Sequence, residues 1–151
     1  MNYPIVFKVL GDVIKYEALV MLFPLITSFY YGSKDANSFM ITIGIMLIIG
    51  IIMSNIKPKN KTFYAKEGFL SVSICWIVIS LFGALPFYIS GAIPSFVDCI
   101  FETVSGFTTT GATILTEVES LPRGGILFWR SFTHWIGGMG ILIFTLALML
   151  L

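Results

Sequence analysis

A run of small polar residues is the part of this sequence best suited to binding an ion: Thr108, Thr109, Thr110, Gly111, Ala112 and Thr113. Channels hold a dehydrated cation with backbone carbonyl oxygens that replace its hydration shell. Glycine allows the backbone angles that turn successive carbonyls to one side, and a threonine hydroxyl adds a further oxygen ligand. The run therefore predicts a cation-coordinating strand, and the competing interpretation is an ordinary exposed loop.

A short apolar segment precedes this run and predicts a helix over about 95–106. Ser95 followed by Asp98 is similar to a capping box, and Gly106 can end the helix in a left-handed conformation. Such a helix is about 15 Å long, so it reaches about halfway through a bilayer. Its partially negative C-terminal end would favour a cation near the membrane centre. The pattern indicates a re-entrant loop, which membranes tolerate only where protein buries it or where it lines a water-filled path.

Two ionisable residues are candidates for supporting this loop. Glu102 either tunes the cation site from behind or is a hydrogen-bonded structural acid of the short helix. Arg130 either pairs with a carbonyl or acid of the loop or anchors the membrane interface. His134, the only histidine, is interpreted as a polar residue near a helix end, with a pH sensor as the alternative. Three glycines of the same apolar segment predict a close-packed helix face: Gly137, Gly138 and Gly140.

The elements that would position these residues are apolar enough to lie in lipid. The chain has 151 residues, of which 57% are hydrophobic and 11% charged, whereas charged residues make up about a quarter of soluble domains. Crossing the hydrocarbon core takes about 20 apolar residues, and a single spanning segment must be a helix. We expect four spanning helices, over about 13–31, 39–53, 69–89 and from 125 onward.

Positive charge predicts the orientation of these helices. Lysines are concentrated between the second and third apolar stretches, at Lys57, Lys59, Lys61 and Lys66. Loops rich in Lys and Arg are retained in the cytoplasm. We therefore expect a multi-pass protein of the inner (plasma) membrane with a cytoplasmic N-terminus. The expected organisation is two N-terminal transmembrane helices (1–56), a cytoplasmic Lys-rich loop (57–67) and a helix–re-entrant loop–helix repeat (68–151).

The residues of this repeat carry a specific resemblance. Segments 101–113, 121–123 and 128–140 resemble the first pore loop and the following helix of the Trk/Ktr superfamily of potassium transporters. The likeness is closest to the TrkH-like membrane subunits and extends over the whole chain in helix order. It implies an all-α integral membrane protein with a potassium-channel-like fold. Such proteins carry four helix–loop–helix repeats around one pore, so this chain looks like the first third of a longer protein.

The resemblance also implies ligands and partners. Thr109, Thr110, Gly111 and Ala112 would hold the filter carbonyls of one quarter of the pore, and a glycine at Gly111 accompanies potassium preference over sodium. Potassium is the permeant ion, and no cofactor is expected. The expected partners are the lipid bilayer, a second copy in a homodimer and a cytoplasmic nucleotide-binding regulatory subunit of the TrkA type.

Other function classes find little support in the residues. A nucleophile–base pair, a metal cluster and a phosphate-binding loop are not apparent, so we expect no enzyme, and the net charge of +1 gives no reason to expect a nucleic-acid partner. A non-conducting truncated fragment or membrane assembly module remains the alternative. A homotetramer of single-loop subunits is a further possibility, although the two additional N-terminal helices would have to fit four times around its ring.

Overall fold

The computed structural model describes residues 3–56 and 65–149. Within these ranges all regular structure is helical, so the predicted all-α fold is confirmed for this part of the chain. Most of the Lys-rich loop, residues 57–64, lies outside the described residues. The elements are α1 (Tyr3–Val20), α2 (Leu22–Tyr31), α3 (Ala36–Ser54), α4 (Ala65–Ile89), α5 (Phe96–Phe107), the 3-10 turn η1 (Val118–Ser120) and α6 (Gly125–Met149).

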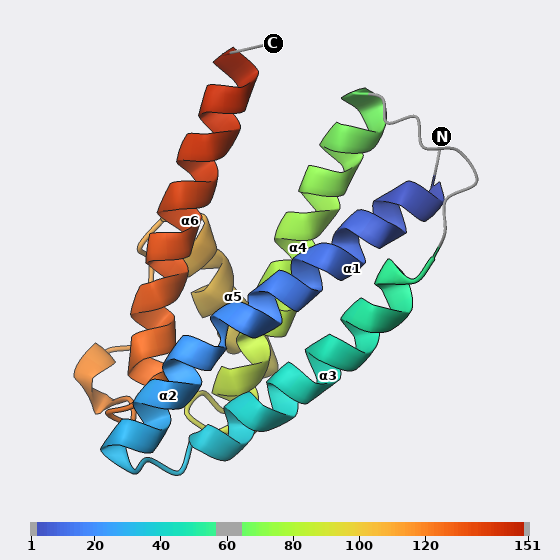
Figure 1. The fold of residues 1–151 in the computed structure, drawn as a ribbon. Coiled ribbons are helices and arrows are strands. Elements are labelled where there is room, and N and C mark those ends of the chain that lie inside the picture. The colour runs from blue at the N-terminus through green and yellow to red at the C-terminus, as the bar shows by residue number, and fades with distance from the viewer. Residues whose placement is uncertain (1–2, 57–64, 150–151) are drawn as a thin grey trace.

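The long helices run back and forth between two ends of the molecule (Figure 1). The starts of α1 and α4 lie at the same end as the end of α6, whereas the turn between α2 and α3 lies at the opposite end with the start of α6. Two of these helices, α3 and the part of α4 from Lys66 to Ile89, are long and apolar enough to cross a membrane by length and composition.

The first predicted span, 13–31, differs from the structure in both its start and its continuity. Helix α1 already begins at Tyr3, and a turn at Met21 separates it from α2. Pro24 lies in the first turn of α2 and has no N–H to donate to the preceding turn, which explains the interruption. The expected start was too late because the charged residues near the N-terminus were placed outside the helix.

Asp12, which the prediction left outside the helix, is accommodated where α1 packs closely against α3. Lys15 Nζ lies 2.7 Å from Asp12 Oδ1 and 2.8 Å from Ser54 Oγ at the end of α3. Ser54 Oγ in turn donates to Asp12 Oδ1 at 2.7 Å. A Cβ on Gly11 would lie 2.9 Å from the carbonyl oxygen of Gly50, so two facing glycines let the backbones approach.

Helix α5 is half the length of its neighbours and contacts both α4 and α6 (Figure 1). Ser95 caps it, since its Oγ accepts from the backbone N–H of Asp98 at 3.5 Å. The predicted role of Gly106 as a left-handed terminator is wrong: the helix continues to Phe107, and Gly106 does not have a positive φ. Close packing explains this glycine, because a Cβ there would overlap Thr133 Oγ1 of α6.

The predicted close-packed face of three glycines reduces to one. A Cβ on Gly137 would overlap the backbone carbonyl of Phe107, which cannot rotate away. The nearest atoms to a Cβ on Gly138 and Gly140 are side-chain carbons of Thr109 and Trp76, at 3.9 Å and 3.8 Å. Only Gly137 is therefore required to be glycine for α6 to lie against the end of α5.

Substitution of Gly137 by alanine should lower stability by about 1–3 kcal/mol, because the added methyl group forces α6 away from the end of α5. The matched control is Gly138→Ala, one residue along the same helix, which should leave stability unchanged or raise it slightly through helix propensity. The apparent Tm in detergent, measured by size-exclusion chromatography after heating, checks both. Equal Tm values for the two variants would contradict the packing argument.

Candidate ion-binding site

The backbone of the loop after α5 takes two left-handed turns. Thr109 has a φ of +56° and Gly111 a φ of +77°, and Thr109 is the only non-glycine residue with positive φ in the described part of the chain. A β-branched residue in this region is strained, and strained backbone is concentrated at functional sites. Residues 108–114 are also exposed on the surface of this chain. The loop is therefore held in a conformation that local preference alone would not select.

Backbone N–H groups at the start of the loop turn back toward α5. Thr109 N donates to the carbonyl oxygen of Gly106 at 2.9 Å, and Thr110 N donates to that of Ser105 at 3.0 Å. In the described part of the chain, the carbonyl oxygens of Thr109, Thr110 and Gly111 accept no hydrogen bond. Three successive acceptors are thus open, which is the arrangement that a carbonyl-coordinated cation requires.

The carbonyl oxygen of Ala112 differs from these three because it accepts a hydrogen bond. Ser105 Oγ donates to it at 2.5 Å, which ties this part of the loop to α5. A carbonyl oxygen has a second lone pair, so Ala112 can still take part in ion binding. Ser105 was not among the expected support residues, and its one sequence signal was a hydroxyl near the end of the helix, seven residues before Ala112.

The threonine hydroxyls are engaged within the protein. Thr108 Oγ1 donates to the carbonyl of Val104 at 2.7 Å and lies 2.8 Å from Thr110 Oγ1. Thr109 Oγ1 donates to the carbonyl of Thr108 at 2.7 Å. These bonds fix the side chains of the loop and leave the carbonyl oxygens of Thr109, Thr110 and Gly111 as the open ligands.

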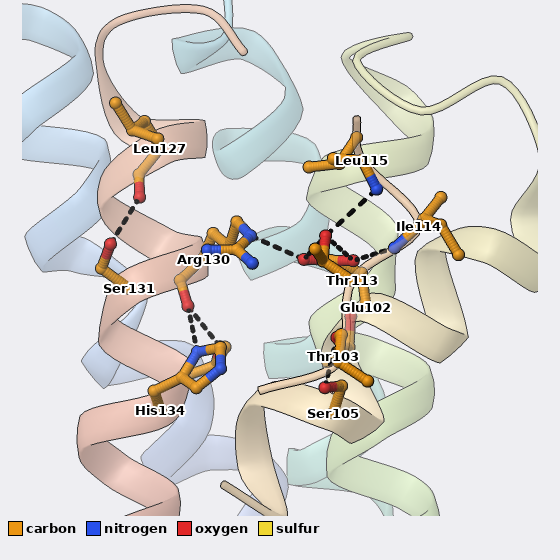
Figure 2. A network of polar contacts seen from close by, with 12 residues as sticks. Glu102, Thr103, Ser105, Thr113, Ile114, Leu115, Leu127, Arg130, Ser131 and His134 are labelled. Carbon is orange, nitrogen blue, oxygen red and sulfur yellow. Dashed lines mark hydrogen bonds and ion pairs between the residues drawn. The ribbon is translucent and has the colours of Figure 1, made fainter. Parts of the chain in front are cut away.

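Glu102 holds the second half of the loop from behind (Figure 2). It is 2% exposed and projects from α5 toward the loop. Thr113 Oγ1 lies 3.0 Å from both of its carboxylate oxygens, and the backbone N–H of Ile114 donates to Oε2 at 3.3 Å. The carboxylate therefore fixes both a side chain and the backbone at the far end of the loop.

Arg130 of α6 neutralises this buried carboxylate (Figure 2). Its Nε lies 2.6 Å from Glu102 Oε1, and the exposed fractions of the two side chains are 14% and 1%. The sequence left two interpretations of Arg130 open: pairing with a carbonyl or acid of the re-entrant segment, or anchoring the membrane interface. In the structure Arg130 pairs with an acid of that segment, Glu102 of α5. His134 lies one turn further along α6, with Nδ1 3.0 Å from the carbonyl oxygen of Arg130.

The site is not of the side-chain metal-binding type. No cluster of three or more His, Cys, Asp or Glu side chains that could hold a metal occurs among the residues described. What the loop offers is neutral backbone oxygen, the ligand type of a permeating alkali cation.

A family model described as a cation transport protein, TrkH, matches residues 35–151. The chain belongs to the TrkH family. This confirms the resemblance inferred from the sequence, and the match includes the whole loop, Glu102 and Arg130.

Individual TrkH-family relatives cover nearly all of this chain. It is 34% identical to the Trk system potassium uptake protein TrkH of Halomonas elongata over 99% of its own length and 31% of the relative. It is 38% identical to a cation transporter of Methanocaldococcus jannaschii, over 91% of its own length and 29% of the relative. The chain thus spans just under a third of the length of these relatives.

A solved structure of the family has the same fold. The crystal structure of the potassium transporter TrkH from Vibrio parahaemolyticus superposes with a TM-score of 0.90 at 31% identity. The superposition covers 98% of this chain and 32% of the TrkH chain.

The ion pair beneath the loop gives a stability prediction. Arg130→Met should destabilise the protein by about 3–5 kcal/mol, because it leaves Glu102 buried without its countercharge. The double variant Glu102→Gln/Arg130→Met should recover much of this loss, since it has no uncompensated charge and Gln can still accept from Ile114. Thermal unfolding in detergent measures both effects.

Arg123→Met is the control, because Arg123 is exposed and its replacement should change stability by no more than about 0.5 kcal/mol. The ion pair would not have the importance given to it here if Arg130→Met were as mild as this control, or if the double variant were no more stable than Arg130→Met.

Proposed function

We propose that this chain supplies one quarter of a potassium-conducting pore, as an N-terminal portion of the membrane subunit of a potassium transporter. The observation that carries the proposal is the row of three unbonded carbonyl oxygens, at Thr109, Thr110 and Gly111, on a strained loop clamped by Glu102. The names of several relatives, Trk system potassium uptake proteins, supply the permeant ion.

In this proposal the loop coordinates potassium through the carbonyls of Thr109, Thr110 and Gly111, with Thr108, Ala112 and Thr113 completing the filter strand. Glu102, Gly106 and Arg130 support it without touching the ion: Gly106 by letting α5 approach Thr133, and the charged pair by fixing the strand. Transport needs no covalent chemistry and no cofactor, so the protein is not an enzyme.

The proposed membrane arrangement follows from the alternation of the helices. With the N-terminus in the cytoplasm of a cell with an inner (plasma) membrane, α1 and α2 run outward together, α3 returns and α4 runs outward again. Helix α5 then re-enters from the outside, and α6 crosses back. This proposed path is supported by α4 and α6 starting at opposite ends of the molecule (Figure 1). The complete transporter would pair as a homodimer and bind a cytoplasmic nucleotide-binding subunit of the TrkA type.

The intact mass of the native polypeptide tests whether the chain is part of a larger pore. A mass about three times that of these 151 residues, as expected from the share of each relative that is covered, supports one quarter of a single-chain pore. A mass equal to this chain would instead favour the alternative, a non-conducting fragment or assembly module, or a homotetramer. Potassium uptake by a transport-deficient cell that expresses the native gene then separates conducting from non-conducting forms.

Replacement of Gly111 by serine in the complete pore should relax discrimination against sodium. A side chain disfavours the φ of +77° at this position, so the adjacent carbonyls lose their common orientation. Gly91→Ser is a closely matched control: Gly91 has a φ of +71°, it is equally open, and it lies before α5 and away from the loop. The measurement is the sodium-to-potassium permeability ratio, and an unchanged ratio in Gly111→Ser would refute the assigned role of this glycine.

A further inference from the structure

The turn between α2 and α3 meets the start of α6 in a tightly packed joint. A Cβ on Gly125 would overlap Ser28 Oγ of α2 and lie 2.7 Å from a ring carbon of Phe39 of α3. Gly124, with a φ of +159°, packs as closely against Ser33. The first residue of α6 is thus already as close to the N-terminal helices as its backbone can come.

One carboxylate lies at the centre of this joint. Asp35, 5% exposed, accepts at Oδ2 a hydrogen bond of 2.9 Å from the backbone N–H of Ile126, in the first turn of α6. Its own carbonyl oxygen accepts from Ser38 Oγ at 2.5 Å, in the first turn of α3. A carboxylate at a helix N-terminus satisfies an unbonded N–H and interacts favourably with the positive end of the helix dipole. Asp35 therefore joins the start of α3 to the start of α6. The two bonded residues, Asp35 and Ile126, are 91 positions apart in the sequence.

The same helix carries the arginine that supports the loop. Ile126 and Arg130 are four residues apart, which is about one turn or about 6 Å along α6. Arg130 pairs with Glu102, and Glu102 holds Thr113 and the backbone of Ile114. A displacement of the first turn of α6 moves Arg130 with it, because the hydrogen bonds within a helix make one turn rigid.

We propose that Asp35 is a positioning residue for ion selection: it sets the place of Arg130 by fixing the start of α6, and through Arg130 and Glu102 it fixes the filter strand. This rests on the proposed function, since it assigns to the N-terminal helices a role in the selectivity of the same loop. The proposal depends on one hydrogen bond, from the backbone N–H of Ile126 to Asp35 Oδ2. The other carboxylate oxygen, Asp35 Oδ1, is buried and accepts no hydrogen bond among the described residues.

The test uses Asp35→Ala and Asp35→Asn in the complete transporter, expressed in cells that lack their own potassium uptake. Asp35→Ala removes the acceptor for Ile126 and should raise the sodium-to-potassium permeability ratio about two- to thirtyfold, the range that mutations along a connected set of residues produce. Asp35→Asn keeps an acceptor oxygen but loses the charge, so its shift should be smaller. Lys34→Ala, an exposed charge in the same turn, should leave the ratio unchanged.

A double-variant cycle separates positioning from a general loss of structure. In a Glu102→Gln background, Asp35→Ala should add little to the change in ratio, because both substitutions interrupt the same series of contacts. Additive shifts would overturn the inference, and so would a wild-type ratio in both Asp35 variants. If Asp35→Ala does not reach the membrane, the same cycle with Asp35→Asn decides the matter.

The outcomes also distinguish this inference from the function on which it rests. A change in ratio for Glu102→Gln with none for either Asp35 variant overturns the role of Asp35 and leaves the filter assignment in place. A wild-type transporter that conducts sodium and potassium equally overturns both.

Discussion

The buried carboxylate of Glu102 is the constraint on which the geometry of the loop depends. Moving an ionised carboxylate out of water costs several kcal/mol even after the protein relaxes. The structure offsets this cost with an arginine on one side and hydrogen bonds from the loop on the other. Glu102 belongs to α5, Arg130 to α6 and Ile114 to the loop, so a change in the relative placement of these three elements would break the contacts that compensate that charge.

Close helix contacts make this placement attainable. The glycines at 106 and 137 let α5 and α6 approach at two successive levels, against Thr133 and Phe107 respectively. One turn before Thr133, on the same face of α6, Trp129 Nε1 donates to the carbonyl oxygen of Gly83 at 2.9 Å, which attaches this turn to α4. Arg130 directly follows this tryptophan, so the rotation of α6 about its own axis is fixed beside the residue that reaches the loop.

The parts of this fold that sequence could predict are those set by local pattern and length. Apolar runs placed α3, α4 and the start of α6 to within a few residues, and the Ser95 cap marked the start of α5. The start of α1 was missed because Asp12, just before the predicted start at 13, is hydrogen-bonded to Ser54, 42 residues away in the sequence. Contacts of that kind depend on how helices meet and leave no periodic signal.

The same limit applies to the site. The prediction that the loop coordinates a cation came from residue types, because Gly111 permits the left-handed backbone found there, and it stays a prediction. Two roles for Arg130 remained open, since the choice depends on the rotation of α6, which is set by Trp129 and Gly83. The bond from Ser105 to Ala112 was unforeseen, because it requires the loop to fold back along α5.

The pairing of Glu102 also bears on how strongly the proposed filter would hold an ion. A carboxylate left unneutralised beside the loop would attract a cation through a medium of low dielectric constant, where charge interactions are strong. Conduction requires binding that is favourable enough for entry and weak enough for exit. With Arg130 2.6 Å from Glu102, the charges behind the loop nearly cancel, and an ion in the proposed filter would meet mainly the dipoles of neutral carbonyls. In that filter the arginine would serve two needs together, because the contact that fixes the loop would also keep a full negative charge from trapping the ion.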